Sequence, residues 1–101
     1  MDRREHLLCR LGEEANEVAQ RVSKALVFGL DEVQPGQPFT NGDRICHELC
    51  DLYALVEMLE EAGVLKHVID IDLIHEKQAK VKQYMEYSKQ CGTLTDGKER
   101  R

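Results

Sequence analysis

The strongest constraint on the fold is a run of apolar residues at helical spacing between residues 45 and 59. On a wheel of about 100° per residue, one stripe contains Ile45, Leu52, Leu55, Val56 and Leu59. The segment from residue 3 to about residue 30 repeats the pattern with Leu11, Ala15, Val18, Val22 and Leu26. Strand signals are few, so we predict an all-α fold, a bundle of three to four helices per chain.

Turn and capping residues separate the predicted helices. Gly29 and the following loop, DEVQPGQPFTNG, end the first helix, because this stretch holds both prolines of the chain. Asn41 is the expected N-cap of the second helix. The second helix then runs to about Ala62, and Gly63 is the expected stop. A loop of about twelve residues is long for a small domain, and long loops are often functional.

The size of the chain allows one domain with a modest core. Its 101 residues are 42% hydrophobic, which is too apolar for a disordered protein. We expect a single helical domain over residues 1–92 and a frayed tail over residues 93–101. Three long helices carry more apolar surface than so short a chain covers, so we expect a homodimer or homotetramer to complete the bundle.

Charge and hydropathy exclude two classes of partner. The formal net charge is −5, which argues against nucleic-acid binding. No apolar run approaches the roughly 18 residues of a membrane-spanning helix, and the first residues, MDRREHLLCRLGEE, are too polar for a secretory signal. We therefore expect no membrane association and a cytoplasmic location, where the four cysteines would stay reduced.

Two pairs of acids interrupt the apolar stripes. Glu48 lies inside the stripe of the second helix, and Asp51 lies at its edge. Glu14 borders the stripe of the first helix, and Glu17 lies one turn further along the same flank. Each pair alone is also typical of a solvated helix surface. Two pairs on successive helices are less easily explained in that way.

Magnesium accounts for both acid pairs. Several carboxylates buried together repel one another, and some must bind protons unless a cation joins them. Mg²⁺ prefers oxygen ligands and often keeps waters and substrate phosphates as its other ligands. An antiparallel pairing of the two helices would bring both acid pairs to one point. The pattern thus indicates a Mg²⁺ site, with Mn²⁺ as a possible substitute.

The motifs EEANE and ELCD resemble the paired motif Glu-Glu-x-x-Glu and Glu-x-x-Asp of the MazG-like all-α nucleoside triphosphate pyrophosphohydrolases. That superfamily also contains dimeric dUTPases and phosphoribosyl-ATP pyrophosphatases. The resemblance covers about residues 10–60 and implies a helical bundle whose four acids bind Mg²⁺. Matched by motif position, the catalytic metal ligands would be Glu14, Glu17, Glu48 and Asp51. Glu13 would be an accessory. The gap of 31 residues from Glu17 to Glu48 is longer than in compact members.

The resemblance also implies a reaction, namely hydrolysis of a nucleoside triphosphate to the monophosphate and pyrophosphate. A housecleaning role towards non-standard or surplus nucleotides would follow. Two alternatives stay open. The chain could be a non-enzymatic helical module that dimerises or binds a partner. It could also act on phosphoribosyl-ATP with the same fold.

A third helix with several lysines is predicted downstream, capped by Asp70 or Asp72 and ending before Gly92. Lys77, Lys80 and Tyr84 share one face of it. Ammonium groups beside a metal would bind phosphate oxygens, and a tyrosine would stack on a base. In MazG-like relatives, basic residues downstream of the acids contact phosphates. The alternative is a solvated face whose lysine stems cover the core.

Cys46, His47 and Cys50 suggest zinc, but a closed zinc site needs four ligands. Cys46 and Cys50 share a helix face, while His47 points elsewhere. We interpret the two cysteines as small buried residues.

Overall fold

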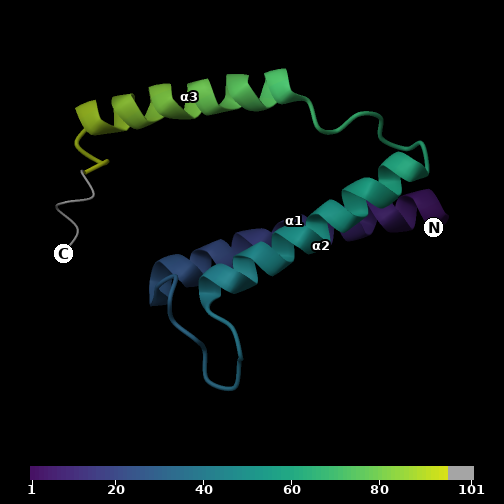
Figure 1. Cartoon of the computed structure of the whole chain (residues 1–101), viewed down its shortest axis with the longest axis horizontal. Helices are drawn as coiled ribbons and strands as arrows, with labels where there is room; N and C mark the ends of the chain where they lie inside the picture. Colours follow the sequence, from purple (N-terminus) through teal and green to yellow (C-terminus); the bar gives the residue numbers. More distant parts are fainter. Residues whose placement is uncertain (96–101) are drawn as a thin grey trace. The chain divides into compact units, whose positions relative to one another are not determined.

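The structure, a computed structural model, describes residues 1–95, which form three helices and no strand. The helices are α1 (Arg3–Phe28), α2 (Asn41–Glu61) and α3 (Ile71–Gln90), as Figure 1 shows. This confirms the all-α prediction. The chain divides into two compact units, Met1–Val68 with α1 and α2, and a second that begins at Ile69 and contains α3. No helix within residues 1–95 is long and apolar enough to cross a membrane.

Side chains at the start of α1 satisfy two backbone N–H groups there. Asp2 Oδ1 accepts a hydrogen bond from the Glu5 backbone N–H at 2.8 Å, and Glu5 Oε1 accepts one from the Asp2 N–H at 3.3 Å. Gly29 follows the helix with a φ of 102°, a conformation that favours glycine. The predicted stop at Gly29 is confirmed.

The start of α2 differs from the prediction by one residue. Thr40 is the N-cap, because its Oγ1 accepts a hydrogen bond from the Asp43 N–H at 3.0 Å. Asn41 is instead the first helical residue, and only 1% of it is exposed. At the other end, Gly63 has a φ of 70° directly after the C-cap Ala62.

The loop between α1 and α2 is tied back to the start of α2. Asn41 Nδ2 donates to the Gly29 carbonyl at 2.8 Å and to Glu32 Oε1 at 2.9 Å. The Asn41 backbone N–H also donates to the Glu32 carbonyl at 3.0 Å. Further along the loop, Arg44 Nη1 donates to Gln34 Oε1 at 2.7 Å. The long loop is therefore held by hydrogen bonds from residues in the first turn of α2.

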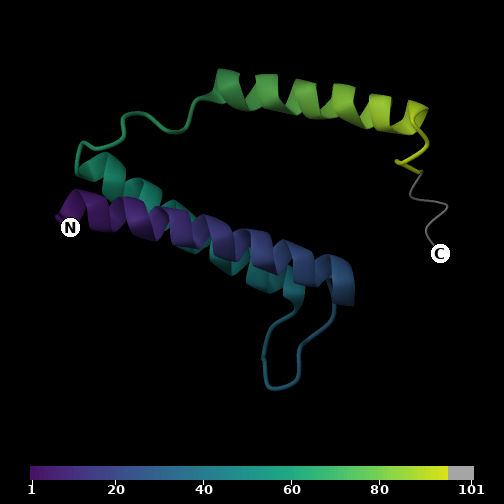
Figure 2. The same cartoon turned by 180° about the vertical axis from the view of Figure 1, so that it is seen from behind.

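Helices α1 and α2 lie side by side and antiparallel, as both views show (Figures 1 and 2). On each helix, six of the buried or half-buried positions alternate in spacing between four and three residues, as in a coiled coil. On α1 these positions are Leu7, Leu11, Glu14, Val18, Arg21 and Ala25. On α2 they are Asn41, Ile45, Glu48, Leu52, Leu55 and Leu59. We call these twelve residues the shared face of the hairpin.

The predicted apolar stripe of α1 is wrong in part. Ala15, Val22 and Leu26 are exposed, and Leu26 is 81% exposed. The buried side of α1 is rotated from that stripe. It includes the charged residues Glu14 and Arg21, which a stripe of apolar residues leaves out. The predicted stripe of α2 is confirmed, with Glu48 inside it and Leu59 fully buried.

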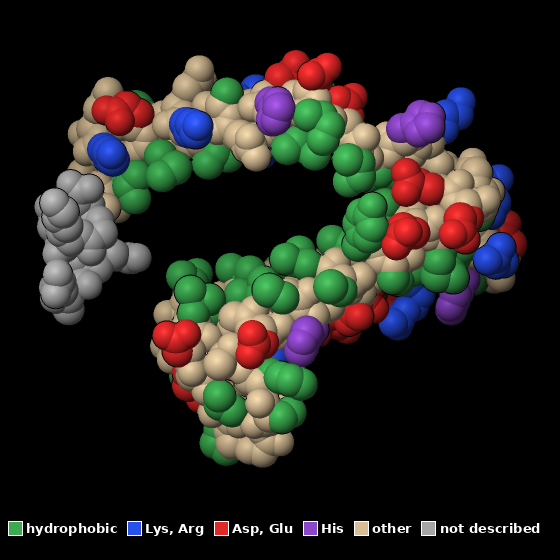
Figure 3. All heavy atoms as spheres, viewed as in Figure 1, with side chains coloured by type: hydrophobic (Ala, Val, Ile, Leu, Met, Phe, Trp, Pro, Cys, Tyr) green, Lys and Arg blue, Asp and Glu red, His purple; other side chains and the backbone are tan. Residues whose placement is uncertain are grey.

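Helix α3 is capped by Asp70, whose Oδ1 accepts a hydrogen bond from the Leu73 N–H at 3.2 Å. None of its residues is buried. Hydrophobic side chains nevertheless run along one side of the helix (Figure 3). Ile71, Ile74, Val81 and Met85 are between 39% and 58% exposed.

The predicted tail begins with Thr93–Thr95, which are described and not helical, with Leu94 half-buried. The rest of it, residues 96–101, lies outside the described residues.

Candidate metal site

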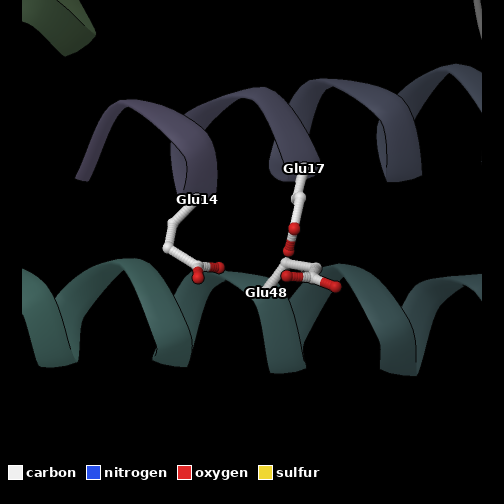
Figure 4. Close-up of side chains that lie close together, drawn as sticks. All are labelled: Glu14, Glu17 and Glu48. Atoms are coloured by element: carbon white, nitrogen blue, oxygen red, sulfur yellow. The ribbon is translucent and has the colours of Figure 1, made fainter. Parts of the chain in front are cut away.

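Three glutamates from two helices meet at the middle of the hairpin, two of them on the shared face and Glu17 beside it. Glu14 and Glu17 extend from α1 and Glu48 extends from α2, and their carboxylates point towards one another (Figure 4). One carboxylate oxygen from each of the three lies within 4.8 Å of the others. The antiparallel hairpin thus brings together three of the four acids that the sequence predicts as ligands.

The three carboxylates are withdrawn from solvent to different degrees. The Glu14 side chain is only 7% exposed, while Glu17 and Glu48 are half-buried. Glu14 Oε2 and Glu48 Oε2 are inaccessible, and no donor within residues 1–95 reaches either atom. A buried carboxylate oxygen without a donor is costly, so these two atoms call for a proton or a cation.

Arg10 contributes the positive charge that contacts this group. Its Nη2 donates to Glu14 Oε1 at 2.8 Å, and its Nη1 donates to Glu13 Oε2 at 2.9 Å. Both partners lie on α1, three and four residues after the arginine, where side chains of one helix meet.

The surroundings favour the protonated form of two of the acids. Burial raises the pKa of Glu14, and the negative charge of Glu17 raises it further, while the Arg10 guanidinium opposes this rise. Burial also raises the pKa of Glu48, as do a hydrogen bond that forms with Glu17 when one of the two carboxyls holds a proton and the charges of Glu17, Asp51 and Glu14. The folded chain therefore holds negative charge at this point at a cost in free energy.

These carboxylates fit a hard divalent cation. All of the converging atoms are carboxylate oxygens, which Mg²⁺ and Mn²⁺ accept as ligands. The orphaned oxygens of Glu14 and Glu48 are the buried groups that a cation would satisfy. Such a cation would also replace the mutual repulsion of the three charges by attraction.

Asp51 lies outside the three-glutamate cluster. It is exposed on α2, one turn after Glu48. Its charge still acts on the site, because it raises the pKa of both Glu14 and Glu48. Its role as a fourth ligand stays a prediction.

The predicted substrate residues Lys77, Lys80 and Tyr84 belong to the second unit. All three are exposed on α3, and Tyr84 is 67% exposed. Their exposure leaves their amine and hydroxyl groups accessible to a ligand. Their contact with phosphate or base stays a prediction.

The interpretation of the cysteines as buried is wrong. Cys9, Cys46, Cys50 and Cys91 are all exposed thiols. Cys46 and Cys50 fall between the positions of α2 that pack against α1. The glutamate cluster is the one grouping with metal-ligand geometry within residues 1–95, so zinc finds no support there.

A surface cavity of about 350 Å³ lies near the end of α2, lined by Glu60, Gly63, Leu65, Lys66 and His67. Glu60 is twelve residues after Glu48, which corresponds to about 18 Å along a helix. The cavity is therefore separate from the carboxylates and is not part of the candidate metal site.

Two cationic residues near the site have no role in the sequence prediction. Arg10 had a signal, because it precedes Glu13 and Glu14 by three and four residues. Arg21 is half-buried on the shared face, and no acceptor within the described residues reaches its buried Nη1. Apolar periodicity gives no signal for a charged residue at such a position.

A scan against protein-family models found no match, and searches of curated proteins and of solved structures found no significant match either. The resemblance to the MazG-like enzymes consequently rests on the acid motifs alone.

Proposed function

We propose that the chain is a Mg²⁺-dependent nucleoside triphosphate pyrophosphohydrolase of the MazG-like type. It would convert a nucleoside or deoxynucleoside triphosphate and water to the monophosphate and pyrophosphate, in a nucleotide-pool housecleaning role. The observation that supports this most is the cluster of Glu14, Glu17 and Glu48 across two helices, in which Glu14 is buried. The motifs EEANE and ELCD, which contain these glutamates, are also the motifs that resemble those of the MazG-like enzymes.

Glu14, Glu17 and Glu48 would hold the cation, with Asp51 as the fourth acid. The bound cation would neutralise the charge of the triphosphate. An acid of the cluster would accept the proton of the attacking water. On α3, Lys77 or Lys80 would bind phosphate oxygens.

Exposed aromatic side chains offer a surface for the base. Phe28, Phe39 and Tyr53 are between 46% and 55% exposed and lie in the same unit as the acids. Phe39 belongs to the loop before α2, and its ring packs edge-on against His47 with 4.8 Å between centroids. A base would stack on one of these aromatic rings or on Tyr84.

The test is pyrophosphate release from a panel of nucleotides with Mg²⁺ or Mn²⁺. Glu48→Gln is expected to lower the rate by about 100-fold or more, because Glu48 would be a metal ligand and is one of the acids able to accept the proton of the water. Glu57→Gln is the matched control, since Glu57 is an exposed acid of the same helix. Full activity of both Glu48→Gln and Asp51→Asn would refute the site. Phosphoribosyl-ATP in the panel tests the alternative substrate.

A non-enzymatic interaction module is the second candidate. The exposed apolar residues of α3 favour it, because a protein partner would cover such a face. This candidate predicts no hydrolysis and no rise in melting temperature with millimolar Mg²⁺. The enzyme predicts a rise, because a ligand that binds only the folded state stabilises it.

The same apolar residues support a further proposal, that a homodimer or homotetramer completes the helical bundle. The residue spacing on α3 matches that of a helix with a packed face. Light scattering of the full chain gives the copy number.

A further inference from the structure

Arg10 links two consecutive glutamates whose environments differ. Its planar guanidinium donates through Nη2 to Glu14 and through Nη1 to Glu13. The Glu14 side chain is 7% exposed, whereas that of Glu13 is 53% exposed and that of Arg10 is 47% exposed. The arginine therefore joins a buried carboxylate of the cluster to an exposed carboxylate outside it.

This contact fixes the Glu14 carboxylate through one of its two oxygens. Oε1 accepts from Arg10, while Oε2 is buried and has no donor within the described residues. A glutamate side chain has several rotatable bonds, and holding it in one rotamer costs free energy. The bond to Arg10 keeps the side chain in its rotamer before any ligand arrives.

Glu13 in turn fixes Arg10. An arginine side chain is long and flexible, and a single exposed partner would leave the guanidinium mobile. Two acceptors at 2.9 Å and 2.8 Å hold both of its terminal nitrogens. Glu13 also accepts a weak hydrogen bond from the Cys9 thiol, with 3.7 Å between sulfur and oxygen.

We propose that Arg10 is a positioning residue of the cation site, which holds Glu14 by Oε1 so that Oε2 is presented to the cation, and that Glu13 holds Arg10 in place. This inference rests on the cation site of the proposed function. It gives the first acid of the EEANE motif a role, which is to orient its neighbour through an arginine.

A competing role predicts different behaviour. If Arg10 were only a substitute cation that leaves when the metal binds, removing its charge would strengthen metal binding. If it positions Glu14, a lysine would be a poor replacement. Lysine keeps the charge, but its single ammonium group lacks the planar fork that spans two carboxylates.

The experiment measures Mn²⁺ binding to the full chain by titration calorimetry without substrate. Arg10→Lys is expected to weaken Mn²⁺ binding by about tenfold, the range known for residues that orient metal ligands. Glu13→Gln is expected to weaken it less, and Arg10→Gln is not expected to bind more tightly than the wild type. Arg4→Lys is the matched control, an exposed arginine on the same helix, and should bind like the wild type.

The outcomes separate this inference from the proposed function. If the wild type binds Mn²⁺ and Arg10→Lys binds it with the same affinity, the positioning role alone is overturned. Tighter Mn²⁺ binding by Arg10→Gln overturns it too. A wild type that binds no Mn²⁺ overturns both. Melting temperatures of the variants exclude a general folding defect. Full occupancy of Arg10→Lys at high Mn²⁺ would show that the loss is one of affinity.

Discussion

The middle of the hairpin's shared face differs from its two ends. At one end Leu7 and Leu59 are buried, and at the other end Asn41 is buried with its amide nitrogen bonded to the loop. In the middle, Glu14 and Glu48 each keep a buried oxygen without a donor. Asn41 Oδ1 and Arg21 Nη1 are also buried without a partner among the described residues, but only the middle brings several carboxylates of like charge together. This contrast identifies the candidate metal site without reference to any motif.

The largest expected effect comes from the apolar end. Leu59 is fully buried, so Leu59→Ala is expected to lower the free energy of unfolding by about 2–5 kcal/mol through lost burial and a cavity. Chemical denaturation monitored by circular dichroism measures the change. Met58→Ala is the matched control, because its side chain is 41% exposed. Equal losses for the two variants would contradict the assignment of Leu59 to the core.

A smaller effect is expected at the polar end. Asn41→Ala removes the donor to the Gly29 carbonyl and to Glu32, and a lost buried hydrogen bond costs about 1–3 kcal/mol. Asn16→Ala, at an exposed position of α1, is the control and is expected to change little. Thermal unfolding of both variants tests this. An unchanged melting temperature for Asn41→Ala would show that the loop is held by its other bonds.

The smallest effect on stability is expected from a change of pH, and it arises from the glutamates in the middle of the shared face. The pKa values of Glu14 and Glu48 are raised in the folded state, so the folded chain binds more protons than the unfolded chain. The stability that these protons confer is fully present below the unfolded pKa and is lost as pH rises through the folded pKa. Without metal, the melting temperature should therefore increase as pH falls from neutral towards 5.

Saturating Mg²⁺ should reverse this trend, because a cation replaces the protons at neutral pH. The measurement is thermal unfolding across pH with and without Mg²⁺. A Glu14→Gln, Glu48→Gln double variant supplies the control. Its melting temperature should lose both the dependence on pH and the dependence on Mg²⁺. If that variant keeps the pH dependence of the wild type, other groups are responsible.

How much of the fold the sequence predicts depends on the helix. On α2 the apolar stripe was sufficient, because Glu48 is the only acid among its shared positions. On α1, Glu14 and Arg21 occupy two shared positions, so apolar periodicity favoured a neighbouring stripe through Val22 and Leu26. A helical wheel contains no information about the partner helix. The charged residues at shared positions of α1 are thus the reason why the apolar pattern did not predict its packed face.

The sequence predicted which glutamates form the candidate site, but not which residue caps α2. The motifs identified Glu14, Glu17 and Glu48, and the structure brings these three together. Asn41 was expected to cap α2, since asparagine is a favoured N-cap. Thr40 takes that position because the asparagine side chain bonds to the preceding loop instead. Such a choice between two adjacent capping residues is decided by tertiary contacts.

The hairpin carries its three clustered glutamates within one chain and one compact unit, residues 1–68. Each added copy in a symmetric assembly would therefore bring a cluster of its own. The ratio of bound cations to chains would stay constant whatever the number of subunits. Metal stoichiometry would then count polypeptides, and it would not report how many of them associate.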